Sequence, residues 1–180
     1  MQCTLVPPAA RQKASAGLQD LYSFPTVASW FLSAGWEQLI NGAPNYGTDK
    51  GAFGQRLGAA ALRGTSQNLF TEAILAPIFH EDDRYYVEGP GYNPVHRTIY
   101  AVTRTIVTRR DDGRKTINGA LLLGYAGSAA LTPTYYPKVN HNFGDVASVY
   151  AGGIGGAALG FFISEFSQDA FRALHLVREQ

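Results

Sequence analysis

Apolar residues recur along this chain at helical spacing, and clusters of glycine, proline and asparagine separate the apolar segments. No segment pairs two clearly alternating strand patterns, so the periodicity indicates an all-α fold of five or six helices. We expect helices within 18–40, from the turn that contains Pro25 to Ile40, and over 52–63, 67–79, 96–109, 117–131 and 146–164. The tail 165–180 has an amphipathic helical pattern.

Proline and serine positions suggest where some of these helices begin and end. Pro25 falls in the first turn of the first helix, where its missing N–H costs nothing. The segment 41–54 is expected to be a loop. Gly64-Thr65-Ser66 is expected to interrupt the helical pattern, with Ser66 as the N-cap of the next helix. Pro77 is expected to kink or end that next helix.

The segment 96–109 is ambiguous between helix and strand. Eight of the eleven residues 98–108 are Thr, Ile or Val, which favours a strand, and Asp112-Gly113 would then form a hairpin turn. The segment that follows is apolar but does not alternate, so it supplies no evident partner strand. We therefore favour a helix over 96–109.

Two helices are expected to carry strips of small residues at intervals of four. One strip comprises Gly152, Gly156 and Gly160, the other Ala120, Gly124 and Ser128, and Gly54 and Gly58 form a shorter version upstream. A glycine inside a helix costs about 1 kcal/mol relative to alanine. Strips of this kind allow two helix backbones to approach closely and gain van der Waals contact. We predict that the two longer strips pack against each other.

The same strips raise the question of a membrane. The run between Asp145 and Glu165 has 19 uncharged residues and the run between Lys115 and Lys138 has 22, and both are close to the roughly 20 residues that cross a bilayer. Both runs are rich in glycine and serine rather than leucine, and Arg104 interrupts the helix before them. A membrane-associated bundle and a soluble, closely packed bundle are both open.

Length and charge narrow the class of protein. The 180 residues suit one domain, which we assign to 18–180 after a flexible arm over 1–17. The net charge of +1 argues against nucleic acid as a partner, because phosphate binding needs an excess of Lys and Arg. Charged residues make up only 16% of the chain, and the single Cys3 excludes an internal disulfide framework.

The densest polar cluster is HEDDRYY at 80–86, just before the turn signal Gly89-Pro90-Gly91. Imidazole and carboxylate groups can bind a divalent metal, and a carboxylate can orient a histidine that acts as a base. However, no paired-histidine spacing is present, and neighbouring residues of one segment cannot all converge on one ion. A loop in which acids and Arg pair with each other is the favoured interpretation. The candidate polar site comprises His80, Asp82, Arg84, Tyr85 and Glu165.

Glu165 belongs to this set because it ends an uncharged run. If it faces inward, it needs a cationic partner, and Arg84, Arg97 and Arg104 are the candidates. His96, His141 and His175 are scattered and could join His80 only if several loops meet. Neither a nucleophile elbow nor a dinucleotide or phosphate loop is present, so no catalytic residue is assigned and no cofactor or metal is predicted.

At HEDDRYY the sequence resembles a family of uncharacterised proteins that is frequent in acidobacterial genomes and usually exported. The family pattern is H-x-D-P-R-Y-[FY], followed by a Gly-rich turn, an Arg-x-x-x-Tyr-Ala helix, a D-x-G-R loop, Tyr-Tyr-Pro and a late Glu-Phe. Asp83 stands where the family has proline, Arg97 fits only approximately, and the similarity covers about 44–167. The matching residues are His80, Asp82, Arg84, Tyr85, Tyr86, Tyr100, Ala101, Asp111, Gly113, Arg114, Asn118, Tyr135, Tyr136, Pro137, Glu165 and Phe166.

The resemblance implies a location in the cell envelope, either periplasmic or membrane-associated, and carries no known activity. With the strips, it predicts a non-enzymatic structural or assembly component that contacts a membrane or a protein partner. The alternatives are a metal-dependent hydrolase or metal-binding protein using His80, Asp82 and Arg84, and a small-ligand carrier using the Tyr-rich loops.

Overall fold

The computed structural model describes residues 15, 18–19, 21–82 and 84–173. Over these residues the chain is mostly helical and has one small three-stranded sheet, so the predicted all-α class is confirmed. The flexible arm predicted over 1–17 lies outside the described residues apart from Ser15, and so do His175 and the rest of the tail beyond residue 173.

Helix α2 (Phe24–Leu39) begins and ends close to the positions that the sequence predicts. The Ser23 side chain accepts a hydrogen bond from the Thr26 amide at 3.4 Å, and Pro25 lies in the first turn. The helix ends at the C-cap Ile40 and packs against α3.

Helix α3 (Lys50–Asn68) runs without interruption through Gly64-Thr65-Ser66, so the predicted break and the predicted N-cap at Ser66 are wrong. The helix also starts earlier than expected, because the Asp49 carboxylate accepts a hydrogen bond from the Ala52 amide at 2.7 Å. The Ser66 hydroxyl donates to the Arg63 carbonyl at 2.9 Å and lies 2.6 Å from the Ser128 hydroxyl. Ser66 therefore joins two helices from the interior of one of them.

The chain continues from α3 into the π-helix η1 (Leu69–Leu75) and the short helix α4 (Ala76–Phe79). Pro77 was expected to kink or end the helix. The helix changes to π-helical geometry just before this proline and ends two residues after it. His80 follows in the left-handed region, with φ 55°, and turns the chain into strand β1 (Glu81–Asp82).

The segment 96–109 is divided, and the single helix that we favoured there is wrong. Helix α5 (Pro94–Thr103) occupies its first part, capped by Asn93, and strand β2 (Val107–Arg110) occupies its last part. The partner strand that the sequence did not reveal is β3 (Lys115–Ile117), joined to β2 through the turn that contains Gly113 at φ 83°. The sheet order is β1-β2-β3, and all pairs are antiparallel.

The last part of the chain forms two apolar helices. Helix α6 (Gly119–Leu131) agrees with the predicted segment and is followed by the 3-10 turns η2 (Thr132–Thr134) and η3 (Lys138–Asn140). Helix α7 (Phe143–Ala173) is one continuous helix of 31 residues, joining the apolar run and the start of the amphipathic tail that the sequence suggested as separate segments.

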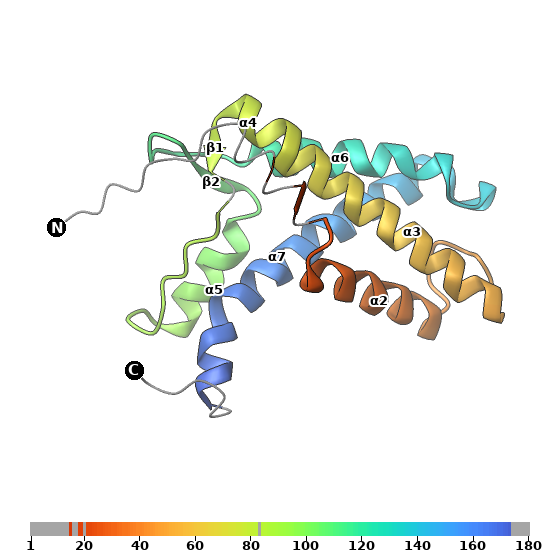
Figure 1. Cartoon of the computed structure of the whole chain (residues 1–180), viewed down its shortest axis with the longest axis horizontal. Coiled ribbons are helices and arrows are strands. Elements are labelled where there is room, and N and C mark those ends of the chain that lie inside the picture. Colours follow the sequence, from red (N-terminus) through yellow and green to blue (C-terminus); the bar gives the residue numbers. More distant parts are fainter. Residues whose placement is uncertain (1–14, 16–17, 20, 83, 174–180) are drawn as a thin grey trace.

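Figure 1 shows how these elements are arranged. Helices α3, η1 and α4 follow one another as a long rod; α6 packs along α3 and η1, and α2 packs against α3. Helix α7 packs against α6, and its C-terminal part lies beside α5 (Figure 1). The sheet lies where α4, α5 and the start of α6 come together.

The interior is unusual because small and charged side chains fill it. Among the described residues, most of the buried apolar positions are alanine, at 34, 52, 59, 60, 76, 101, 120 and 129. Arg56 and Glu165 are the largest side chains that are completely buried. The large apolar side chains face outward instead; the exposed ones include Phe24, Leu32, Leu39, Val95, Ile99, Ile117, Leu123, Val139, Phe143, Leu159 and Ile163.

Candidate functional site

The structure divides the predicted polar site into two clusters and leaves His80 outside both. Tyr85 and Glu165 belong to a cluster between α5 and α7, which we call the Glu165 cluster. Asp82 and Arg84 belong to a second cluster beside the sheet, which we call the Asp82 cluster. The two are connected through the chain at 84–86.

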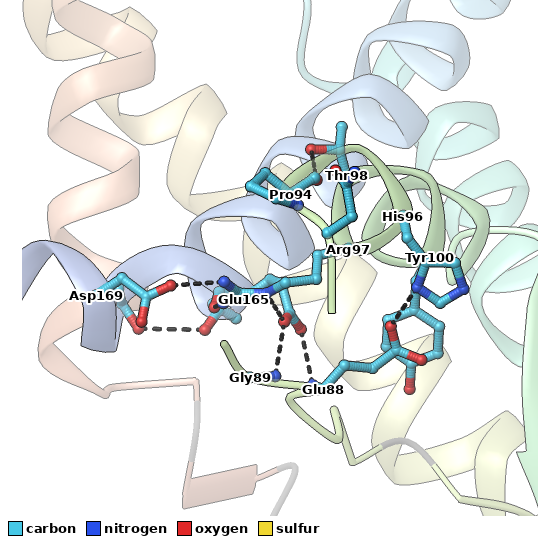
Figure 2. Close-up of polar contacts among 12 residues, drawn as sticks. Glu88, Gly89, Pro94, His96, Arg97, Thr98, Tyr100, Glu165 and Asp169 are labelled. Carbon is cyan, nitrogen blue, oxygen red and sulfur yellow. Dashed lines mark hydrogen bonds and ion pairs between the residues drawn. The ribbon is translucent and has the colours of Figure 1, made fainter. Parts of the chain in front are cut away.

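Arg97 of α5 is the centre of the Glu165 cluster, as Figure 2 shows. Its Nε donates to Glu165 Oε1 at 2.7 Å, its Nη2 donates to the Glu165 carbonyl at 2.7 Å, and its Nη1 donates to Asp169 Oδ2 at 2.6 Å. The ring of Phe166 lies 4.4 Å from the guanidinium carbon. Of the three arginines that the sequence offered as partners for Glu165, the structure therefore selects Arg97.

The second oxygen of Glu165 is occupied as well. Tyr85 donates its hydroxyl to Glu165 Oε2 at 2.8 Å. The amides of Glu88 and Gly89 donate to the same carboxylate at 3.2 Å each, as Figure 2 shows. Burial, together with the Glu165 carboxylate next to it, raises the pKa of Tyr85, so the phenol stays a neutral donor.

This geometry makes the Glu165 cluster a cross-link rather than a reaction centre. Glu165 is fully buried, and its carboxylate accepts four hydrogen bonds, so it has no free lone pair directed at a substrate. A buried charge that is paired and fully hydrogen-bonded holds its neighbours in register, and removing one partner is costly. The cluster therefore fastens α5, α7 and the segment 85–89 to one another.

The Asp82 cluster has the same character. Arg84 donates from Nε and Nη2 to the two Asp82 carboxylate oxygens at 3.0 and 3.1 Å, and Tyr86 donates to Oδ2 at 2.7 Å. Burial alone would raise the pKa of Asp82, but the hydrogen bonds from Arg84 and Tyr86 outweigh burial and hold the pKa below its ordinary value. The guanidinium groups of Arg84 and Arg109 lie 5.7 and 5.4 Å from the centre of the Tyr86 ring.

The three histidines that the structure describes each contact a different part of the chain. His80 Nδ1 lies 2.9 Å from the Pro77 carbonyl, His96 lies 3.0 Å from the Glu88 carboxylate, and His141 Nε2 lies 2.9 Å from the Tyr136 carbonyl. Within the described part of the chain, no group of three His, Cys, Asp or Glu side chains is positioned to hold an ion.

The α6 strip is buried and closely packed. A Cβ atom at Gly124 would lie 2.9 Å from the amide nitrogen of Thr71 and 3.0 Å from its Cα, so the backbones of α6 and η1 nearly touch. One turn on, the Ser128 hydroxyl donates to the Arg63 carbonyl at 3.2 Å. At the other end of the strip, Glu81 Oε2 accepts the Ala120 amide at 3.1 Å and caps the helix.

The α7 strip does not meet the α6 strip, so this part of the prediction is wrong. A Cβ atom at Gly152, Gly156 or Gly160 would have nothing within 4 Å. The close approach of α7 to α6 is made by Gly153, where a Cβ atom would lie 2.7 Å from Tyr125 and 2.9 Å from Gln67. The bulky Tyr125 faces α7, so α6 offers its small-residue face to η1 instead. Gly54 and Gly58 are open too.

The α7 strip lines a cavity of about 1160 Å³ between α2 and α7. Trp30 and Trp36 of α2 contribute to its opposite wall. An ionic pair lies along it: Arg63 Nη2 is 3.2 Å from Glu37 Oε1, and Arg63 Nη1 donates to the Tyr136 hydroxyl at 3.0 Å. The three glycines are thus accessible along one helix face.

Several residues with structural roles were not singled out from the sequence. Asp169 was missed because it follows the apolar run in a segment that looks like an ordinary amphipathic tail. Arg56 was not singled out either, yet it is fully buried and donates to the carbonyls of Gly42, Pro44 and Gly47 at 2.6 to 3.0 Å. The one indication of its burial in the sequence was its position in an alanine-rich segment.

Comparison with known proteins adds no identity: the chain matches no family model, no curated protein and no solved structure.

Proposed function

We propose that this protein is a non-enzymatic structural component of a cell-envelope membrane, with α7 inserted in the bilayer. The observation that carries the proposal is the stretch Phe143–Ala170 of α7. The most apolar 18-residue window of this stretch has a mean hydropathy of 1.7, and none of that window is buried inside the protein. At 1.5 Å per residue the stretch is about 42 Å long, more than the roughly 30 Å of a bilayer core.

The distribution of side chains supports the same proposal. The helix α5 directs Arg97 and Ala101 inward and Val95 and Ile99 outward. Water would favour the reverse arrangement, because burying apolar area releases about 25 cal/mol per Å². A lipid solvent imposes no such preference on apolar side chains, and it requires charged groups to pair inside the protein, as Arg97 and Glu165 do.

The open α7 strip supports an assembly role within that membrane. Association of helices in lipid depends on close van der Waals packing, and small residues at intervals of four permit it. Gly152, Gly156 and Gly160 present such a face with nothing against it inside this chain. A helix of another subunit is the partner that this face suits. The resemblance to exported acidobacterial proteins is consistent with an envelope location and remains a prediction.

The test is membrane fractionation of the full chain, followed by a carbonate wash. The wild-type protein is expected to remain in the membrane pellet. Leu159→Arg introduces a charge on the exposed face of α7 and is expected to release the protein, because arginine near the centre of a membrane helix costs about 2.5–3.5 kcal/mol. Val139→Arg in η3 is a matched control, since Val139 is equally exposed but lies outside α7, and it is expected to stay in the pellet.

Two results would overturn the proposal. One is release of the wild-type chain by carbonate. The other is purification of the intact chain without detergent as a stable monomer, because the exposed apolar faces of α5 and α7 would then be tolerated in water.

A further inference from the structure

The small sheet contains buried acids and exposed cations. The two acids of β1 are buried: Glu81 accepts hydrogen bonds from the amides of Gly119 and Ala120 at 3.1 Å, and Asp82 is held by Arg84 and Tyr86. The exposed cations lie around the turn between β2 and β3, and they are Arg110, Arg114 and Lys115.

The turn between β2 and β3 carries a net positive charge. The residues 107–117 contain four cations and two acids. One of the acids, Asp112, is bound to Arg114, its carboxylate lying 2.6 Å from the guanidinium. Arg110 and Lys115, on either side of the turn, are exposed.

An exposed apolar surface adjoins these cations. On α5 it is formed by Val95, Ile99 and Val102, which follow each other at intervals of three and four and are all exposed. It continues through Ile106 into the hairpin, and the pairing register then places Val107 opposite Ile117. Two residues further along each strand, on the same face of the hairpin, Arg109 is paired with Lys115. This face therefore changes from apolar to cationic toward the turn.

We propose that this surface, comprising the outer face of α5 and the β2–β3 hairpin, docks on a bilayer that contains anionic lipids. The inference rests on the proposed membrane location and adds the class of lipid that the protein recognises. The apolar side chains enter the acyl region at the boundary with the headgroups, and the hairpin cations lie among the headgroup phosphates. A nucleic acid or an acidic protein would use the cations, but neither would use the narrow apolar stripe beside them.

The experiment uses the full chain with Cys3→Ser and Ile117→Cys, labelled at the new thiol with an environment-sensitive fluorophore. The chain is mixed with vesicles of phosphatidylcholine alone or of phosphatidylcholine with phosphatidylglycerol. We expect a blue shift of the emission with the anionic vesicles that is much weaker with the neutral ones and that is reversed by salt.

A pair of matched variants isolates the hairpin charge. Arg110→Gln with Lys115→Gln removes two exposed cations of the hairpin, and Lys50→Gln with Lys138→Gln removes two exposed cations from the start of α3 and from η3. Because each basic residue near an anionic surface contributes about 1 kcal/mol, the hairpin variant is expected to need about thirtyfold more anionic lipid for the same shift. The control variant is expected to respond like the parent protein.

The outcomes separate this inference from the proposed function. If the chain resists carbonate but the probe responds equally to neutral and anionic vesicles, docking is overturned and the membrane function stands. If the probe responds as expected in a chain that carbonate releases, docking stands without insertion of α7. An equal blue shift produced by soluble polyglutamate or by heparin without vesicles would identify an acidic macromolecule as the partner and overturn the lipid assignment.

Discussion

The strips on α6 and α7 have the same spacing of small residues and opposite surroundings. Gly124 on α6 lies against the backbone of Thr71, whereas Gly156 on α7 has nothing within 4 Å of the position of a Cβ atom. The α6 strip is held by shape and by a hydroxyl pair, and the C-terminal part of α7 is held by the buried carboxylate of Glu165. Small residues thus permit a close approach of two helices but do not determine which helix approaches.

If α7 is held by charge rather than by its strip, the largest loss should come from the buried carboxylate. Glu165→Ala removes the buried carboxylate partner of the Arg97 guanidinium, which then keeps only the partly exposed Asp169, and it is expected to lower the free energy of unfolding by about 3–5 kcal/mol. Chemical unfolding in detergent micelles, followed by circular dichroism, measures this loss.

Asp169→Ala is the control, because Asp169 is partly exposed and its pairing with Arg97 is expected to contribute about 1 kcal/mol or less. Equal losses in the two variants would contradict the view that Glu165 is the main attachment of α7.

The next effect tests whether the α6 strip is held by shape. Gly124→Ala places a methyl group 2.9 Å from the Thr71 amide nitrogen, which belongs to a helix backbone and cannot rotate away. Overpacking of this kind is expected to lower the free energy of unfolding by about 1–3 kcal/mol. The same unfolding assay measures it, and a variant as stable as the wild type would show that α6 and η1 are less closely packed than the structure indicates.

A smaller effect is expected at the hydroxyl pair between α3 and α6. Ser128→Ala removes the bond with Ser66 and is expected to cost about 0.5–1.5 kcal/mol, because Ser66 keeps its bond to the Arg63 carbonyl. Ser164→Ala on α7 removes only a bond to the Gly160 carbonyl of its own helix and should have less effect in the same assay. The comparison of the two strips would fail if the serine on α7 mattered more.

The smallest effect has the opposite sign. Gly156→Ala has free space for its methyl group and gains helix propensity, so the free energy of unfolding of the monomer in micelles is expected to rise by up to about 1 kcal/mol. In membranes the same variant should reduce cross-linking of α7 to a partner helix, because the methyl group separates the two backbones. Destabilisation in micelles would mean that a part of this chain packs against the α7 strip.

Local signals in the sequence were sufficient for much of the fold. The start of α2 follows from Pro25, whose effect acts over a few residues. The apolar character of 117–131 likewise predicts α6 correctly, and the start of that helix is capped by Asn118, whose side chain accepts the Leu121 amide. The partner of Glu165 could be narrowed to three arginines because a buried acid needs a cation.

The β2–β3 hairpin could not be predicted from local signals in the sequence. Thr, Ile and Val fill both α5 and the chain that leads into β2, so composition does not locate the change from helix to strand. Strand β2 exists because β1, about 26 residues upstream, and β3 supply its hydrogen-bond partners. Neither partner is longer than three residues, so neither leaves an alternating pattern to detect.

The sequence by itself determined the helical class, the position of α6 and the faces on which small residues gather, because these depend on interactions between residues a few positions apart. Only the tertiary structure decided that Gly124 is buried against η1, that Gly156 is open and that Arg97 rather than Arg84 or Arg104 meets Glu165. Each of these outcomes is a choice among partners far apart in the chain. The choice depends on which side chains, such as Tyr125, already occupy the space between two helices.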